Sequence, residues 1–352
     1  MPAVKTKTVW FCKSCGNESP KWMGRCPACG EWNTMVEETV ATGKKASVAD
    51  RVPGAGQKPM PLSEIDSSVE NRISLNNDEV DRILGGGLVE GSLVLIGGEP
   101  GIGKSTLSLQ IPLNCPNLKT LYVTGEESAR QVKLRASRIG GDDANCLIYS
   151  ETLMENIIKE AREMMPDLMV VDSVQTMFSQ NVESSPGSVT QIRETAAMLL
   201  RFAKETGVPV ILIGHITKEG SIAGPKILEH IVDVVLQFEG DNRGTYRLLR
   251  SIKNRFGSTS ELAVFEMTGK GLREVSNPSE MLIPMHEEGL SGVAVSAMLD
   301  GTRPFLIEVQ SLVSSAAYGT PQRSATGFDV RRLNMLLAVL EKRAGFKLGV
   351  KD

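Results

Sequence analysis

The sequence has no excess of positive charge and no long apolar run. It holds 39 Lys and Arg against 42 Asp and Glu, so its formal net charge is −3. Such a chain has no overall attraction for nucleic acid or an anionic membrane, and polyanion binding would depend on local clusters of Lys and Arg. The apolar run 208–213 is far shorter than the roughly 20 residues that span a bilayer. The N-terminus MPAVKTKTVWFC has no apolar core for a secretion signal. We therefore expect a cytoplasmic protein without membrane association.

Cysteine is scarce, and four of the six cysteines form two C-x-x-C pairs separated by ten residues. In a cytosolic chain this spacing indicates metal binding rather than disulfides. Each pair can present two thiolates to one tetrahedral Zn²⁺, and a segment this small would need the metal in order to fold. A redox-active dithiol would need only one pair, so we predict a structural zinc site. Whether this site contacts DNA or protein stays open. Its ligands are Cys12, Cys15, Cys26 and Cys29.

The composition divides the chain into four segments. Residues 1–36 hold the cysteine pairs and all three tryptophans, and are predicted to form a zinc finger. Residues 37–70 have few apolar runs and are interpreted as a flexible linker. From residue 71 to 278 strand and helix patterns alternate, which indicates an α/β domain with a doubly wound, mostly parallel sheet and a late antiparallel edge. Residues 279–352 are expected to add one β-hairpin and one helix, a thin and incomplete domain.

Apolar runs and turn signals predict the individual elements. The strands of the α/β domain are expected at 93–97, 120–124, 145–149, 168–172, 208–214, 232–239, 245–252 and 261–267. Its helices are expected at 127–139, at 152–164 and from about 185 to Gly207. A further helix should start near Gly103, and Pro112 should limit it to about two turns. In the final segment, a hairpin is expected around Asp300-Gly301 and a helix after the capping residue Asp329.

One segment matches the phosphate-binding pattern G-x-x-x-x-G-K-[ST] between a predicted strand and a predicted helix. It reads Gly98, Glu99, Pro100, Gly101, Ile102, Gly103, Lys104 and Ser105. The glycines let backbone N–H groups converge on the β-phosphate. Lys104 offers a positive charge to the β- and γ-phosphates, and Ser105 offers its hydroxyl to Mg²⁺. We therefore predict that the chain binds and hydrolyses a nucleoside triphosphate with Mg²⁺.

Hydrolysis also needs a second Mg²⁺ ligand and a group that orients the attacking water. Asp172 ends an apolar strand, which places its carboxylate beside the phosphate loop unless it simply caps the next segment. Glu126 and Glu127 end another strand at the same edge. We choose Glu126 to orient water, because Glu127 could equally cap the following helix, and both could lack a chemical role. His215 could contact the γ-phosphate or be ordinary polar loop material.

With these residues assembled, the chain resembles the bacterial RadA (Sms) family, RecA-type ATPases with an N-terminal zinc finger. The shared motifs cover nearly the whole length. They are the four-cysteine knuckles, GEPGIGKST at 98–106 (ending on Thr106), YVTGEESARQVKLRA at 122–136, VVDSVQTM at 170–177, GHITKEGSIAGPKILEH at 214–230 and KNRFG at 253–257. The resemblance implies a RecA-like P-loop ATPase core that uses ATP, with Thr106 and His215 in the nucleotide site. It also implies that residues 279–352 begin a Lon-protease-like α+β domain, which in the family continues well past this point.

The KNRFG motif implies a shared active site. By the resemblance, Lys253 and Arg255 reach the nucleotide site of a neighbouring subunit and stabilise charge on the γ-phosphate, as arginine fingers do. Without the resemblance they would be two solvated charges on a turn. A finger acting in trans implies a ring or a filament, and the family forms hexameric rings. Segments 178–188 and 216–226 would face its channel, where Lys218 and Lys226 could follow a single-stranded DNA backbone.

Two functions remain open at this point. We favour a hexameric, ATP-driven motor on single-stranded DNA that promotes branch migration in recombinational repair, with branched DNA and the RecA recombinase as partners. The alternative is a RecA-like ATPase switch that binds a protein partner through its zinc finger. ATP turnover that rises with single-stranded DNA would distinguish the first from the second. Protease activity is disfavoured, because residues 280–352 offer no Ser–Lys or Ser–His constellation.

Overall fold

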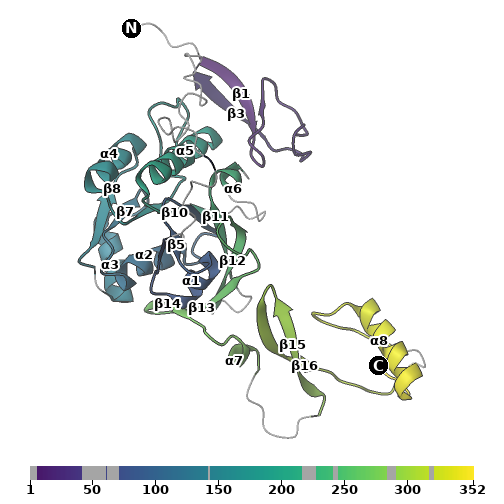
Figure 1. The fold of residues 1–352 in the computed structure, drawn as a ribbon. Helices are drawn as coiled ribbons and strands as arrows, with labels where there is room; N and C mark the ends of the chain where they lie inside the picture. The colour runs from purple at the N-terminus through teal and green to yellow at the C-terminus, as the bar shows by residue number, and fades with distance from the viewer. Residues whose placement is uncertain are drawn as a thin grey trace. The chain divides into compact units, whose positions relative to one another are not determined.

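The computed structural model describes residues 6–41, 61, 71–141, 143–215, 227–240, 245–283, 291–316 and 321–352. The chain divides into two compact units, whose elements are drawn in Figure 1. The first contains Met1–Ser276 together with Asp300–Arg303, and the second contains Asn277–Leu299 and Pro304–Asp352. None of the helices within the described residues is both long enough and apolar enough to cross a membrane.

A nine-stranded sheet forms the centre of the first unit, in the order β14-β13-β12-β11-β6-β10-β9-β7-β8. The six strands from β11 to β8 in this order run parallel, and β12, β13 and β14 add to β11 through antiparallel pairs. The predicted doubly wound sheet with a late antiparallel edge is confirmed. The strands are β6 (Leu93–Gly98), β7 (Thr120–Thr124), β8 (Cys146–Ser150), β9 (Leu168–Asp172), β10 (Val210–His215), β11 (Val234–Gly240), β12 (Tyr246–Asn254), β13 (Leu262–Thr268) and β14 (Gly271–Glu274).

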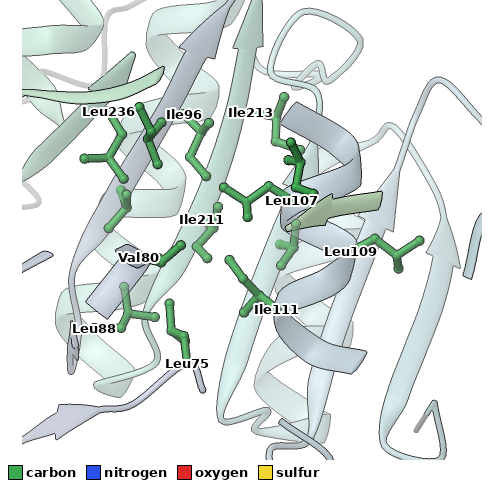
Figure 2. Close-up of a cluster of buried hydrophobic side chains, with 14 of the residues drawn as sticks. Leu75, Val80, Leu88, Ile96, Leu107, Leu109, Ile111, Ile211, Ile213 and Leu236 are labelled. Atoms are coloured by element: carbon green, nitrogen blue, oxygen red, sulfur yellow. The ribbon is translucent and has the colours of Figure 1, made fainter. Parts of the chain in front are cut away.

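Helices cover both faces of this sheet because alternate residues of each buried strand point to opposite faces. On β6, Val94 and Ile96 belong to one buried cluster, whereas Leu93 and Leu95 belong to the other. The first cluster includes residues of α1 (Asp78–Leu84), α2 (Lys104–Asn114) and α3 (Ala129–Ile139). Figure 2 shows part of it, with Val80 of α1 and Leu107 of α2 near Ile96 and Ile211 of the sheet. The second cluster includes residues of α4 (Met154–Met164), α5 (Val189–Thr206) and α6 (Ile227–Ile231).

The helix after the phosphate loop is longer than predicted. We expected Pro112 to limit it to about two turns, but α2 continues through Pro112 to Asn114. Pro112 lies in the last turn, so its missing N–H removes one hydrogen bond near the end of the helix. Ile111, Pro112 and Leu113 are all buried, and we attribute the continuation of the last turn to this packing.

The N-terminal segment forms a three-stranded antiparallel sheet in the order β2-β1-β3. Its strands are β1 (Thr6–Cys12), β2 (Glu18–Ser19) and β3 (Met35–Ala41). β3 pairs with β1 along its whole length, with Thr6 opposite Ala41. The sheet therefore extends past residue 36, where the predicted linker begins. Residues 42–60 and 62–70 of that predicted linker lie outside the described residues.

The remaining short elements are β4 (Arg72–Ile73), β5 (Leu88–Val89) and α7 (Ser279–Leu282). In the last segment, β15 (Val293–Asp300) and β16 (Arg303–Gln310) pair as the expected hairpin. α8 (Val330–Ala344) follows the predicted cap, since the Asp329 carboxylate accepts a hydrogen bond from the Arg332 N–H at 2.9 Å. The hairpin and the capped helix are thus confirmed, while the likeness of this segment to a Lon-protease-like domain stays a prediction.

Candidate nucleotide-binding site and metal centre

The predicted nucleotide-site residues lie at one edge of the central sheet. Parallel strands present their carboxyl ends together, and ligands of open α/β sheets bind at that edge. β10 pairs with β6 so that His215 lies opposite Gly98. β7 pairs with β9 so that Thr124 lies opposite Asp172. The sheet therefore brings together residues as distant in the sequence as Gly98 and His215.

The phosphate loop connects β6 to α2, and two of its glycines have backbone conformations that other residues rarely adopt. Gly101 has φ 77° and Gly103 has φ 117°. A Cβ at Gly103 would also lie 2.8 Å from Cε of Met267. A Cβ at Gly98 would lie 2.9 Å from Cβ of Phe238. The phosphate-binding pattern requires glycine at 98 and 103, and the positive φ of Gly101 favours glycine there as well.

Lys104 is buried at the first position of α2. Its Nζ donates hydrogen bonds to the carbonyl oxygens of Gly98 at 2.9 Å and Glu99 at 2.8 Å. Burial lowers the pKa of Lys104, while the nearby carboxylates of Asp172 and Glu126 raise it. The ammonium group is therefore held within the loop by acceptors that a phosphate oxygen could replace.

Asp172 is buried at the end of β9, with an incomplete set of hydrogen bonds. The Tyr122 hydroxyl donates to Asp172 Oδ2 at 2.8 Å, whereas no described residue forms a hydrogen bond with Oδ1. Burial raises the pKa of Asp172, against the lowering effect of the Ser105 and Tyr122 hydroxyls. A buried carboxylate oxygen without a partner, beside the Ser105 hydroxyl, fits an oxygen ligand set for Mg²⁺.

Glu126 and Glu127 have different partners. Glu126 Oε1 lies 2.9 Å from His215 Nε2 and accepts a hydrogen bond from the Ser173 hydroxyl. The hydrogen bond with His215 lowers the pKa of Glu126, with burial opposing it. Glu127 instead forms an ion pair with Arg135. Of the two carboxylates, Glu126 is therefore the one grouped with His215, Lys104 and Asp172.

Three residues near the site were missed at the level of sequence. Tyr122 binds Asp172, Ser173 binds Glu126, and the Arg247 Nε donates to the carbonyl oxygen of Ile102 in the phosphate loop at 2.9 Å. Tyr122 lies on β7 and Ser173 directly follows β9. The pairing of these two strands could have indicated both residues. Arg247 lies near the start of β12, outside the KNRFG motif that begins at the end of the same strand, and no sequence signal indicates it.

The KNRFG motif lies at the opposite end of the strands, near the start of β6. The Arg255 N–H donates to the Asp233 carbonyl oxygen, and the Asp233 N–H donates to the Leu93 carbonyl oxygen at the start of β6. Lys253 Nζ donates to the carbonyl oxygens of Glu229 at 2.6 Å and Val232 at 2.7 Å. With a rise of roughly 3.3 Å per residue, β6 separates this edge from its own phosphate loop by about 17 Å.

The side chains of the motif are held by neighbouring residues. Arg255 Nη1 lies 3.2 Å from Asp233 Oδ1, while the Arg255 side chain is 54% exposed. Burial and the positive charge of Arg255 lower the pKa of Lys253, against the opposing effect of Asp233 and Glu229. Lys218 and Lys226, which we predicted to follow DNA, lie outside the described residues.

The four cysteines of the N-terminal sheet converge as predicted. Their sulfur atoms all lie within 4.8 Å of one another. The glycine after each pair has a positive φ and donates its N–H to the carbonyl oxygen of the first cysteine of that pair, Gly16 to Cys12 at 2.8 Å and Gly30 to Cys26 at 2.9 Å. Burial raises the pKa of Cys12, but hydrogen bonds with Thr34 and with backbone amides outweigh it and lower the value to about 6. Four thiols this close fit a tetrahedral Zn²⁺.

Two family models match the segments of the chain that hold these two sites. Residues 59–221 match the family described as "AAA domain", and residues 10–37 match the "Rubredoxin metal binding domain". Two solved structures resemble part of the chain: the RadB recombinase (TM-score 0.47, 22% identity, 58% of this chain and 99% of that one) and a KaiC-like protein of Pyrococcus horikoshii OT3 (TM-score 0.49, 22% identity, 59% and 100%).

The sheet, the phosphate loop and the cysteine cluster define a RecA-like P-loop ATPase with an N-terminal zinc ribbon. The chain is 50% identical to the DNA repair protein RadA of Bacillus subtilis (strain 168), over 99% of this chain and 77% of that protein. It is 48% identical to the DNA repair protein RadA of Pseudomonas aeruginosa, over 97% of this chain and 76% of that protein. The chain therefore belongs to the RadA family.

Proposed function

We propose that this protein is an ATPase of recombinational DNA repair that works as a hexameric ring on single-stranded DNA and promotes branch migration. The observation that carries the proposal is the separation of two half-sites. The phosphate loop lies at one end of β6, and Lys253 and Arg255 lie beyond the other end. A chain with this arrangement needs a second copy to complete the charge stabilisation around the γ-phosphate.

Within one subunit, each residue at the phosphate-loop edge has a distinct role. The backbone N–H groups from Gly98 to Thr106 bind the phosphates, and Lys104 exchanges its carbonyl partners for β- and γ-phosphate oxygens. Ser105 and Asp172 would hold Mg²⁺, which supplies positive charge against the developing negative charge. Glu126 orients the attacking water. His215, hydrogen-bonded to Glu126, is placed to contact the γ-phosphate.

Across the subunit interface, Lys253 and Arg255 serve the neighbour's nucleotide. Head-to-tail contacts between identical chains form a ring when the rotation between subunits closes, and in the proposed hexamer each contact joins one phosphate-loop edge to one finger edge. Arg255 already exposes about half of its side chain. Lys253 would exchange its carbonyl partners for phosphate oxygens, which form stronger charge-assisted hydrogen bonds.

DNA as the substrate is supported by the relatives, which carry the name DNA repair protein. Lys218 and Lys226 are our candidates for contacts with the DNA backbone in the channel of the ring, with branched DNA and the RecA recombinase as further partners. Sequence-independent contacts of this kind depend strongly on salt concentration.

A mixing experiment tests the shared site. Lys104→Ala removes phosphate binding but keeps the finger, and Arg255→Ala keeps the phosphate loop but lacks the finger. Each variant alone should lack DNA-stimulated ATP turnover. In a one-to-one mixture, about a quarter of the interfaces combine an intact loop with an intact finger, so turnover should return to about that fraction. A mixture as inactive as its components would refute the action in trans.

A three-stranded branch-migration assay tests the motor. Wild type should extend the branched intermediate with ATP, and Lys104→Ala should not. ATP turnover that is indifferent to single-stranded DNA, with no strand movement, would contradict the motor and favour the ATPase switch that binds a protein partner. Electron microscopy of the same samples would report the ring.

A further inference from the structure

Two tryptophans of the zinc ribbon are exposed, although indole rings are usually buried for most of their area. Trp22 is 55% exposed and Trp32 is 69% exposed. The third tryptophan, Trp10, is half-buried and packs against the cysteine cluster. Folding of the ribbon therefore accounts for Trp10 but not for the other two.

The two exposed rings both lie close to Gly24. A Cβ at Gly24 would lie 3.6 Å from Cη2 of Trp22 and 3.8 Å from Cζ3 of Trp32. Both are ordinary contact distances, so the two indoles are neighbours at this glycine.

Backbone contacts around the second cysteine pair hold Trp32 and Arg25 side by side. Arg25 and Trp32 form an antiparallel β-bridge, and the Asn33 N–H donates to the Gly24 carbonyl oxygen at 2.7 Å. The Arg25 guanidinium carbon lies 5.8 Å from the centre of the Trp32 ring, a cation–π distance. Its Nε donates to the Gly30 carbonyl oxygen at 2.8 Å. Neither Nη atom forms a hydrogen bond with a residue that the structure describes.

The chemistry of this surface fits an unpaired nucleobase better than a protein. Single-stranded nucleic acid is bound by aromatic faces beside positive charges, with little need for enclosure. Lys21 and Arg25 are both exposed and flank Trp22 in the sequence. A protein hot spot would need further apolar contacts around it to exclude water. Within the described residues 8–37, however, no other large apolar side chain is exposed.

We propose that Trp22, Trp32 and Arg25 form a stacking site for unpaired bases of single-stranded nucleic acid. The indole faces stack on bases, and the free Nη donors of Arg25 bind a neighbouring phosphate. This site is distinct from the channel loops of the motor proposed above and does not depend on the ATPase cycle.

Tryptophan fluorescence of the full zinc-loaded chain tests the proposal directly. All three tryptophans lie in residues 1–36, so the emission reports only on the ribbon. Addition of an oligothymidylate, without ATP, should quench the emission, and an abasic strand of the same length should quench it much less. Trp22→Ala and Trp32→Ala should each weaken oligothymidylate binding about 5- to 100-fold, whereas Trp32→Phe should retain most of it.

Two controls keep the test decisive. Phe346→Ala removes an exposed aromatic side chain (56% exposed) in the second unit and should leave binding unchanged. Zinc content measured for every variant reports whether the ribbon remains folded. Emission that does not respond to the oligothymidylate, or equal quenching by the abasic strand, would overturn the proposal. So would zinc-loaded Trp22→Ala/Trp32→Ala protein that binds as tightly as Phe346→Ala. Quenching without DNA-stimulated ATP turnover would support the stacking site and refute only the motor.

Discussion

A buried ion-pair network connects the turn Asp300–Arg303 to the rest of the first unit. Removing Arg303 from this network has a stability cost that can be predicted. The Glu79 side chain is 7% exposed. Its Oε2 accepts hydrogen bonds from Arg303 Nη1 at 2.5 Å, Arg82 Nη2 at 2.9 Å and the Val264 N–H at 3.1 Å. Arg303 Nη2 also donates to the carbonyl oxygens of Val275 and Ser276. We therefore predict that Arg303→Ala destabilises the ATPase core although the residue lies in a hairpin turn.

The magnitude follows from what remains around Glu79. Removing one partner of a fully buried ion pair costs about 3–5 kcal/mol, because the other charge is left uncompensated. Arg82 and the Val264 N–H still contact the carboxylate in the variant, so we expect a loss of about 2–3 kcal/mol. For a unit of this size each kcal/mol lowers Tm by about 2–4 °C, so the expected decrease is roughly 4–12 °C.

Thermal melts followed by far-UV circular dichroism measure this decrease. Arg273→Ala is the matched control, because Arg273 is paired with Glu266 but its side chain is 72% exposed. An exposed pair of this kind contributes less than about 1 kcal/mol. Arg303→Lys keeps a positive charge opposite Glu79 and should recover part of the loss. If Arg303→Ala melts at the same temperature as Arg273→Ala, the turn is not part of the core's ion-pair network and the reasoning is wrong.

Three further predictions concern the two sites. Asp172→Asn should abolish ATP turnover yet stabilise the nucleotide-free core by about 1 kcal/mol, because it removes a buried charge whose Oδ1 has no partner among the described residues. Since burial raises the pKa of Asp172, the wild type gains stability as the pH falls through that pKa. Thermal melts at several pH values measure this gain. The same gain in Asp172→Asn would show that Asp172 is not its source. Gly103→Ala should lose ATP binding in equilibrium dialysis, because its φ is 117° and its Cβ would lie 2.8 Å from Met267; near-normal binding would show that the loop adapts. Zinc chelation should shift the emission of Trp10 to longer wavelength, with the helical circular dichroism of the core unchanged; an unshifted spectrum would show that the ribbon folds without metal.

Much of the central sheet could be predicted because several of its strands, among them β6, β7 and β9, are buried over their whole length. β7 and β9 have the bounds that the apolar runs indicate, and all five residues of each are buried. α1 was missed because its seven residues give too little helical periodicity to stand out. The place of Arg303 in the core could not be predicted either, since its partner Glu79 lies 224 residues away in the chain.

In the candidate nucleotide site, too, some residues follow from local sequence and others depend on residues distant in the chain. The phosphate loop is a contiguous motif, so local sequence predicts it, and Asp172 follows from its position at the end of a buried strand. The choice between Glu126 and Glu127 depends on side chains distant in sequence. Arg135, two turns into the following helix, pairs with Glu127, whereas His215 reaches Glu126 from a strand on the far side of β9.

Asp233 connects the two half-sites of the proposed ring. It lies just before β11, where its carboxylate accepts hydrogen bonds from the Leu93 N–H and from Lys204 Nζ and contacts Arg255. Leu93 begins β6, and the same strand ends at the phosphate loop. The buried strand is thus fixed at one end to the residue that holds the finger and at the other to the loop that binds phosphate. These contacts form a continuous connection from the phosphate loop along β6 to Arg255, by which nucleotide binding in one subunit of the proposed ring could affect the finger presented to the next.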